Sequence, residues 1–165
     1  MDDRISVVPD LIAAIVSKAT AAAEGNDEDH PLYGRYVEDG YGTSNGAYAD
    51  VLMVGVEDPQ TDDANSAETT EELAFVGPAV TRDEKGYVTC LAMSDDGGGN
   101  QKAARDAAYR TAMGVAMLLA ADYQLGVTGL LWTVVGSRTR LNQGQDSDRG
   151  AVALLTFRIY FEARL

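Results

Sequence analysis

The stretch Ala151-Val-Ala-Leu-Leu-Thr-Phe-Arg-Ile-Tyr-Phe-Glu-Ala163, close to the C-terminus, alternates small or apolar side chains with others at a period of two. This alternation predicts a β-strand with one buried face. The face expected to be buried carries Ala151, Ala153, Leu155, Phe157, Ile159 and Phe161. The opposite face carries Thr156, Arg158, Tyr160 and Glu162, which we expect to meet solvent or a partner.

A second strand precedes this one. Leu130–Val135 is rich in β-branched and aromatic side chains, which favour strands, so Gly129–Leu165 is expected to form one long hairpin. The intervening segment, Gly136–Gly150, is rich in Gly, Asn, Gln and Asp. It predicts a large solvated loop at the hairpin tip.

Length and charge limit the possible functions. The chain has 165 residues, which predicts a single domain over residues 1–165. It has 13 basic and 26 acidic residues and a formal net charge of −13, which disfavours nonspecific binding to a phosphate backbone. The N-terminus lacks a basic segment followed by an apolar one, and the longest apolar run is too short to span a bilayer, so no membrane association is expected. Cys90 is the single cysteine and is expected to be a buried thiol in a protein made in the cytoplasm.

The charges are also unevenly distributed. Between Glu24 and Glu72 there are fourteen acidic residues and one basic residue, Arg35, whereas the closing hairpin is rich in arginine. Opposite charges on different parts of one chain favour head-to-tail self-association. A solvated acidic surface without a partner is the alternative explanation.

The remaining chain predicts two helices and four further strands. Pro9 to about Gly25 has apolar residues at helical spacing, and Asn100–Gln124 begins with a residue suited to cap a helix. Strands are expected at Leu32–Asp39, Ala47–Val56, Glu71–Val80 and Tyr87–Met93, with a turn at Asp83–Gly86 and exposed loops near residues 57–71 and 136–150. The fold class is therefore α/β (α+β), a mainly antiparallel mixed sheet of about five or six strands with two helices against one face.

No pattern of catalytic, cofactor-binding or metal-binding residues is convincing. Asp27, Glu28, Asp29 and His30 are adjacent in a loop and cannot all point at one ion, and His30 is the only histidine available for nucleophilic catalysis. The glycine-rich segment Ser94–Asn100 precedes a helix as a phosphate-binding loop would, but it has no lysine and contains two aspartates. A small α/β ligand-binding or enzyme domain that uses this loop remains the alternative from a different functional class.

A binding surface is the better prediction. The solvent face of the last strand combines arginine, tyrosine and glutamate, the mixture found in specific protein interfaces. The residues expected to contact an adjacent subunit or a tube are Arg138, Arg140, Arg158, Tyr160 and Glu162.

The order of features resembles the tail terminator proteins of long-tailed, non-contractile bacteriophages. The similar segments are Asp50-Val-Leu-Met-Val-Gly55, Tyr87-Val-Thr-Cys90, the helix that ends in Asp122-Tyr-Gln-Leu-Gly126, and Gly150-Ala-Val-Ala-Leu-Leu-Thr-Phe157. The resemblance covers about residues 8–163. The acidic loop from Glu57 to Glu72 is unusually long for this family.

The resemblance implies a structural virion protein without enzymatic activity or cofactors. It would form a homohexameric ring on the tail tube, stop polymerisation of the major tail protein and offer a docking surface to head-closure proteins. The protein would lie at the head–tail junction of the virion, after assembly in the host cytoplasm. Another neck or connector protein is the nearest alternative.

The resemblance also suggests a use for the acidic charge, since an acidic ring lumen would let DNA pass without binding it. The candidate lumen or loop residues are Asp27, Glu28, Asp29, Glu57, Asp58, Asp62 and Asp63.

Overall fold

The computed structural model describes residues 5–42, 48–57, 65–76 and 79–165. It contains two helices and six strands in the order α1 (Val8–Ala23), β1 (Tyr36–Asp39), β2 (Asp50–Val54), β3 (Ala67–Val76), β4 (Ala79–Asp96), α2 (Gln101–Ala121), β5 (Leu130–Asp146) and β6 (Gly150–Arg164).

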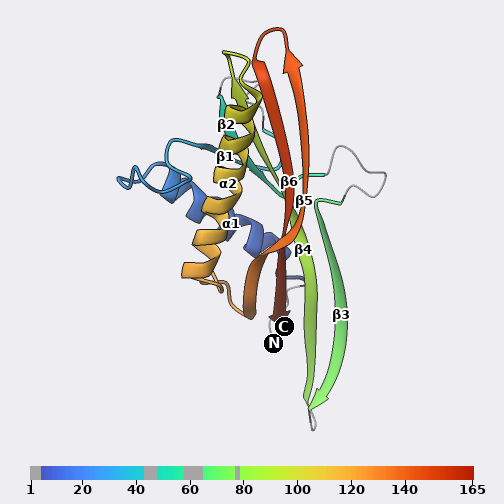
Figure 1. Cartoon of the computed structure of the whole chain (residues 1–165). Helices are drawn as coiled ribbons and strands as arrows, with labels where there is room; N and C mark the ends of the chain where they lie inside the picture. The colour runs from blue at the N-terminus through green and yellow to red at the C-terminus, as the bar shows by residue number, and fades with distance from the viewer. Residues whose placement is uncertain (1–4, 43–47, 58–64, 77–78) are drawn as a thin grey trace.

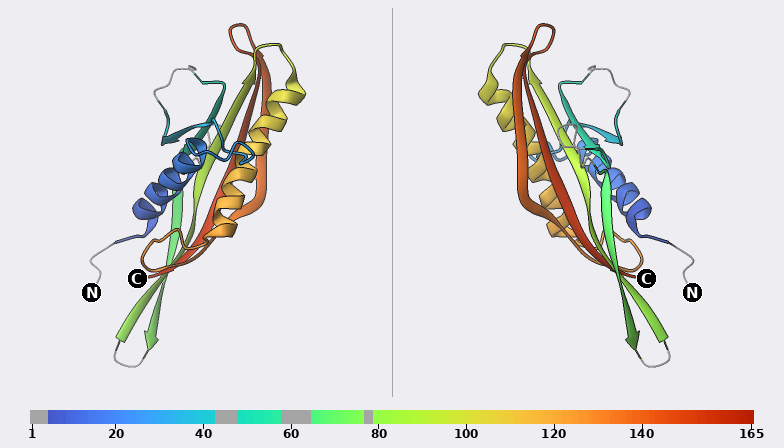
Figure 2. Two further views of the ribbon diagram at one scale, coloured as in Figure 1. Left: turned by 90° about the vertical axis from the view of Figure 1, so that its left-hand side faces the viewer. Right: turned by 90° about the vertical axis from the view of Figure 1, so that its right-hand side faces the viewer.

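The six strands form one mixed sheet with the order β1-β2-β4-β6-β5, and β3 pairs with β4 outside this path. Only β1 and β2 are parallel; the other pairs are antiparallel. Both helices cover the same face of the sheet (Figures 1 and 2). The predicted fold class is therefore confirmed.

The main core lies between the helices and the sheet. Phe157, Ile159 and Phe161 of β6 are at most 1% exposed, and Leu11 and Ile15 of α1 belong to the same cluster. The predicted buried face of the last strand is thus confirmed. A smaller cluster of Val51, Met53, Val56 and Leu91 contains residues of β2 and β4 whose side chains point to the other face. Val51–Val54 is apolar without alternation, which predicts a strand covered on both faces. The burial of these four residues confirms that prediction.

Both helices start close to their predicted positions. Pro9 lies in the first turn of α1, where its missing N–H costs nothing. The side chain of Asn100 accepts a hydrogen bond from the Ala103 N–H (3.2 Å), as an N-cap should. For the second helix the sequence also predicts an apolar stripe of Ala104, Ala108, Met113, Val115, Ala116, Leu119 and Tyr123. This prediction is partly wrong, because Met113 and Tyr123 are 50% and 55% exposed.

The predicted turn at Asp83–Gly86 was wrong. These residues continue β4, which pairs with β3 from Val88 back to Ala79, and the chain reverses between Val76 and Ala79. Gly86 suits this strand because a Cβ there would lie 2.0 Å from the Glu68 carbonyl oxygen of β3. The sheet therefore contains a longer β3–β4 hairpin than the sequence predicts. The Gly77-Pro78 pair in the expected strand Glu71–Val80 predicts a bulge or an edge position. These two residues lie outside the described part of the chain.

Three other boundaries also differ from the predictions. Residues 136–146 extend β5, and Thr139–Asp146 pair with β6, so the predicted large loop shrinks to residues 147–149. The loop expected near 57–71 ends where β3 begins, at Ala67. The expected strand at Leu32–Asp39 begins only at Tyr36, since residues 31–34 form turns that leave Gly34 with a φ of +73°.

A buried carboxylate connects α1 to the sheet. Glu84 of β4 is fully buried, and its Oε2 accepts a hydrogen bond from the Val7 N–H (2.8 Å) at the start of α1. Its Oε1 accepts another from the Ser6 hydroxyl. A carboxylate at a helix N-terminus satisfies unpaired N–H groups and is favoured by the helix dipole. Glu84 therefore fixes where α1 starts on the sheet.

Replacing Glu84 with alanine should destabilise the fold. The change leaves the Val7 N–H and the Ser6 hydroxyl without an acceptor, which we expect to lower the free energy of unfolding by about 2 to 4 kcal/mol. Urea denaturation followed by circular dichroism measures this. Glu72→Ala, at an exposed position of β3, is the matched control and should change it by less than about 0.5 kcal/mol. Equal effects of the two substitutions would contradict the role of Glu84.

Candidate assembly surface

The face of the sheet opposite the helices carries a cluster of aromatic and charged side chains, which we call the central patch. It comprises Lys85 and Tyr87 of β4, Trp132 of β5, and Arg158, Tyr160 and Glu162 of β6. Strand alternation places the three β6 residues on one face. The register then sets Tyr160 opposite Tyr87, and Glu162 opposite both Lys85 and Trp132.

One half of the central patch is a stack around Tyr87. The guanidinium carbon of Arg158 lies 3.9 Å from the centroid of the Tyr87 ring, and the rings of Tyr87 and Tyr160 are 5.8 Å apart at a tilt of 58°. The Tyr87 hydroxyl donates a hydrogen bond of 2.6 Å to Glu68 of β3. Burial, and then this hydrogen bond, raise the pKa of Tyr87.

The other half is organised by Glu162. Its Oε2 accepts a hydrogen bond from the Trp132 indole N–H (2.9 Å), and its Oε1 lies 3.5 Å from Lys85 Nζ. Gly136 of β5 allows the Tyr160 ring to pack closely against the backbone, because a Cβ at this position would lie 2.3 Å from Cε2 of Tyr160. The aromatic rings border a shallow cleft of about 230 Å³. Half-exposed aromatic and arginine side chains held in fixed orientations are typical of the energetic centre of a protein interface.

The structure brings together three of the five predicted interface residues. Arg158, Tyr160 and Glu162 all belong to the central patch. Arg138 and Arg140 are exposed on β5, on the way to the hairpin tip; Arg138 lies within a register shift between Val135 and Thr139, and Arg140 lies beyond it. Lys85 and Tyr87 were missed, because the predicted turn removed Lys85 from the sheet and nothing in the sequence gave the register between β4 and β6.

The predicted acidic residues do not form one cluster among the described residues. Asp27, Glu28 and Asp29 are exposed in the connection between α1 and β1, which lies on the helix side of the sheet (Figure 1). Glu57 is exposed after β2, and its carbonyl accepts a hydrogen bond from the Tyr41 hydroxyl (2.7 Å). Asp58, Asp62 and Asp63 lie outside the described residues.

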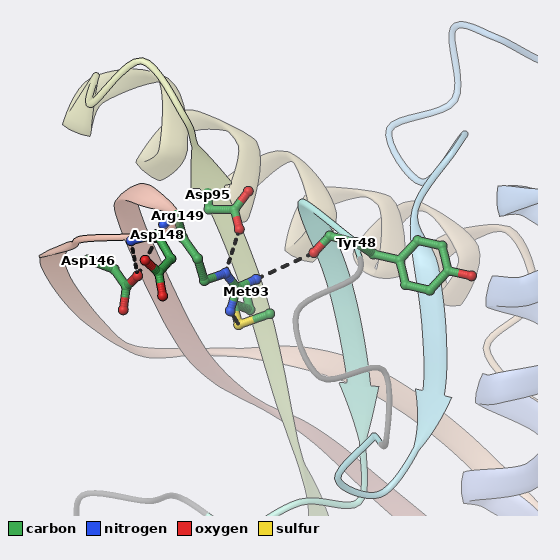
Figure 3. A network of polar contacts seen from close by, with 6 residues as sticks. All are labelled: Tyr48, Met93, Asp95, Asp146, Asp148 and Arg149. Carbon is green, nitrogen blue, oxygen red and sulfur yellow. Dashed lines mark hydrogen bonds and ion pairs between the residues drawn. The ribbon is translucent and has the colours of Figure 1, made fainter.

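The tip of the closing hairpin is held by Arg149 (Figure 3). Its Nε donates to Asp95 Oδ2 (2.7 Å), and its other nitrogens lie 3.4 Å from the Tyr48 carbonyl oxygen and 3.5 Å from Met93 Sδ. Asp146 Oδ1 accepts the Arg149 N–H (3.0 Å). The residues around Arg149 border an open groove of about 380 Å³ on the same face as the central patch. Arg149 therefore ties the tip to β4 and to the segment before β2.

The glycine-rich connection before α2 offers little to an anionic ligand. Asp96 Oδ2 accepts the N–H of Asn100 (2.8 Å), so a carboxylate already stands at the helix N-terminus where a phosphate would bind. Among the described residues no group of three or more His, Cys, Asp or Glu side chains could hold a metal ion. Within the same part of the chain, neither helix has both the length and the apolar character needed to span a membrane.

Comparison with known proteins gives a structural match only. No model of a protein family matches the sequence, and no curated protein matches it. The structure is similar to a chain in the virion of a native gene transfer agent (GTA) particle, with a TM-score of 0.56 and 12% identity. The match covers 98% of this chain and 100% of the other. This chain shares the fold of a virion subunit.

Arg149 provides a test of how the tip is held. Arg149→Ala removes a partly buried charge-assisted hydrogen bond, and we expect the free energy of unfolding to fall by about 1 to 2 kcal/mol. Chemical denaturation measures the change. Arg138→Ala is the control, since this residue is exposed on the adjacent strand, and it should have little effect. A tip stabilised only by strand pairing would make the two variants equally stable.

Proposed function

We propose that this protein is a tail terminator of a phage or phage-like particle. Six copies would form a ring on the end of the tail tube, stop its polymerisation and provide the surface on which head-closure proteins dock. The observation that carries the proposal is the end-to-end match of this fold with a chain of a phage-like virion. The sequence resemblance to tail terminators supports the same role.

The central patch supports a function based on binding. Its side chains are already oriented by hydrogen bonds and ring stacking, so a partner would pay little entropy to order them. We propose that the patch contacts the adjacent subunit or the tube, and that Arg138 and Arg140 extend this contact along β5. No chemical step is needed for either contact.

We further propose that acidic residues line the ring lumen. The net charge of −13 makes the protein repel a DNA backbone, so the genome would pass without specific binding. The segments assigned to this role are Asp27–Asp29 and the acidic residues from Glu57 to Asp63.

Removing the aromatic and cationic centre of the patch should impair assembly. In Arg158→Ala/Tyr160→Ala we expect a folded monomer that no longer forms rings or stops tube growth. Native mass spectrometry with light scattering gives the oligomeric state, and electron microscopy of tubes grown with the tail tube protein gives their length. Trp132 is the only tryptophan, so its fluorescence emission shows directly whether the patch becomes buried on assembly.

The control for this experiment is Lys18→Ala/Tyr33→Ala. Lys18 forms an exposed ion pair with Asp122 (2.9 Å) and Tyr33 is 41% exposed, both outside the central patch. This variant should assemble like the original protein. Normal assembly of the patch variant would refute the patch as a contact, and an original protein that neither forms rings nor shortens tubes would refute the proposed function.

The lumen proposal predicts a separate phenotype. Replacing the acidic residues of Asp27–Asp29 and of Glu57–Asp63 with Asn or Gln should leave ring formation intact but slow DNA ejection, because DNA would no longer be repelled. Ejection from assembled particles can be followed by fluorescence of a DNA-binding dye. Unchanged ejection in particles with intact rings would refute the lumen assignment.

A further inference from the structure

A two-stranded arm projects from the sheet. It consists of β3 and the first part of β4, Ala79–Val88, and it extends beyond the end of β6, whose last paired residue, Arg164, lies opposite Asp83. Figure 2 shows this arm pointing away from the helices and the rest of the sheet. The arm is therefore a part of the subunit that reaches outward.

The described part of β3 is acidic and carries one exposed apolar side chain. Leu73 is 63% exposed, and Glu71 and Glu72 beside it are also exposed. No basic residue occurs in Ala67–Val76. Leu73 and Glu71 share a face of the strand because they are two residues apart. Glu71 lies 3.8 Å from Arg82, a loose surface pair that costs little to exchange for another partner.

The outer side of α2 has the complementary character. Tyr109, Met113 and Met117 are 43%, 50% and 48% exposed and are spaced four residues apart, so they form one apolar stripe along the helix. Arg105 and Arg110 lie on either side of Tyr109 in the sequence. Adaptable methionines beside tyrosine and arginine form a surface suited to binding another protein.

We propose that the arm of one copy docks on the α2 stripe of the next copy. Leu73 would pack against Tyr109 and Met113, and Glu71, on the same face of the strand, would lie near Arg105 and Arg110. The arm points away from α2 of its own chain, so the contact joins two different surfaces. Such a heterologous contact forms a ring when the rotation between copies closes. This inference rests on the proposed ring but assigns its subunit contact to residues outside the central patch.

Engineered cysteines test this contact directly. Cys90 is fully buried and burial raises its pKa to about 12, so it will not compete with introduced thiols. Leu73→Cys and Met113→Cys proteins are mixed under mild oxidation, and we expect a disulfide-linked pair of the two variants. The control mixes Leu73→Cys with Tyr33→Cys, which places a thiol at a 41% exposed position outside the central patch and should give no more product than either variant alone.

Charge reversal provides a second measurement. Arg105→Glu/Arg110→Glu should weaken self-association roughly tenfold or more at low salt, and adding Glu71→Lys should restore much of it. The docking proposal is overturned if rings form but Leu73→Cys links equally to Tyr33→Cys or to neither partner. It is also overturned if the reversed charges give no rescue. An original protein that stays monomeric with and without tube protein would instead count against the ring itself and hence against both proposals.

Discussion

The pairing of β4 with β6 is the constraint on which the other features depend. Antiparallel bonds run from Asp83 opposite Arg164 to Asp96 opposite Ala151, so two long strands share one register over most of their length. On its other edge β4 pairs first with β3 and then with β2. A slip of one residue would turn every side chain of β6 to the wrong face and disperse both the core and the central patch.

The buried carboxylate of Glu84 fixes the position of the start of α1 on this sheet. Burying a carboxylate is unfavourable unless hydrogen bonds replace its water. Here the donors are the Val7 N–H and the Ser6 hydroxyl, which are themselves at a helix N-terminus in need of acceptors. An apolar residue at this position would pack but would not specify where the helix begins.

Patterns within short stretches of sequence were enough to predict the buried face of the last strand and the start of the second helix. The alternation in Ala151–Ala163 predicted which side chains of β6 face the core and which three belong to the central patch. The capping residue Asn100 predicted where α2 begins. The errors at Asp83–Gly86 and Ser137–Asp146 have a common cause, since polar residues in both segments resemble loops. Asp83–Gly86 is polar because Glu84 caps a helix distant in sequence, and Ser137–Asp146 is polar because it forms an exposed edge strand. Tyr87 and Lys85 joined the patch only through a register that no local pattern encodes.

The hydrogen bond between Tyr87 and Glu68 has a consequence for the order of assembly. Glu68 belongs to the arm and Tyr87 to the central patch, and Arg158 lies on the Tyr87 ring. A displacement of the arm therefore reaches the patch through two adjacent contacts. If a neighbour holds the arm still, as we propose, the patch would also lose freedom and would bind its own partner at a smaller entropic cost. Such a subunit would join a growing structure more readily once one contact is made, which would favour completed assemblies over scattered pairs.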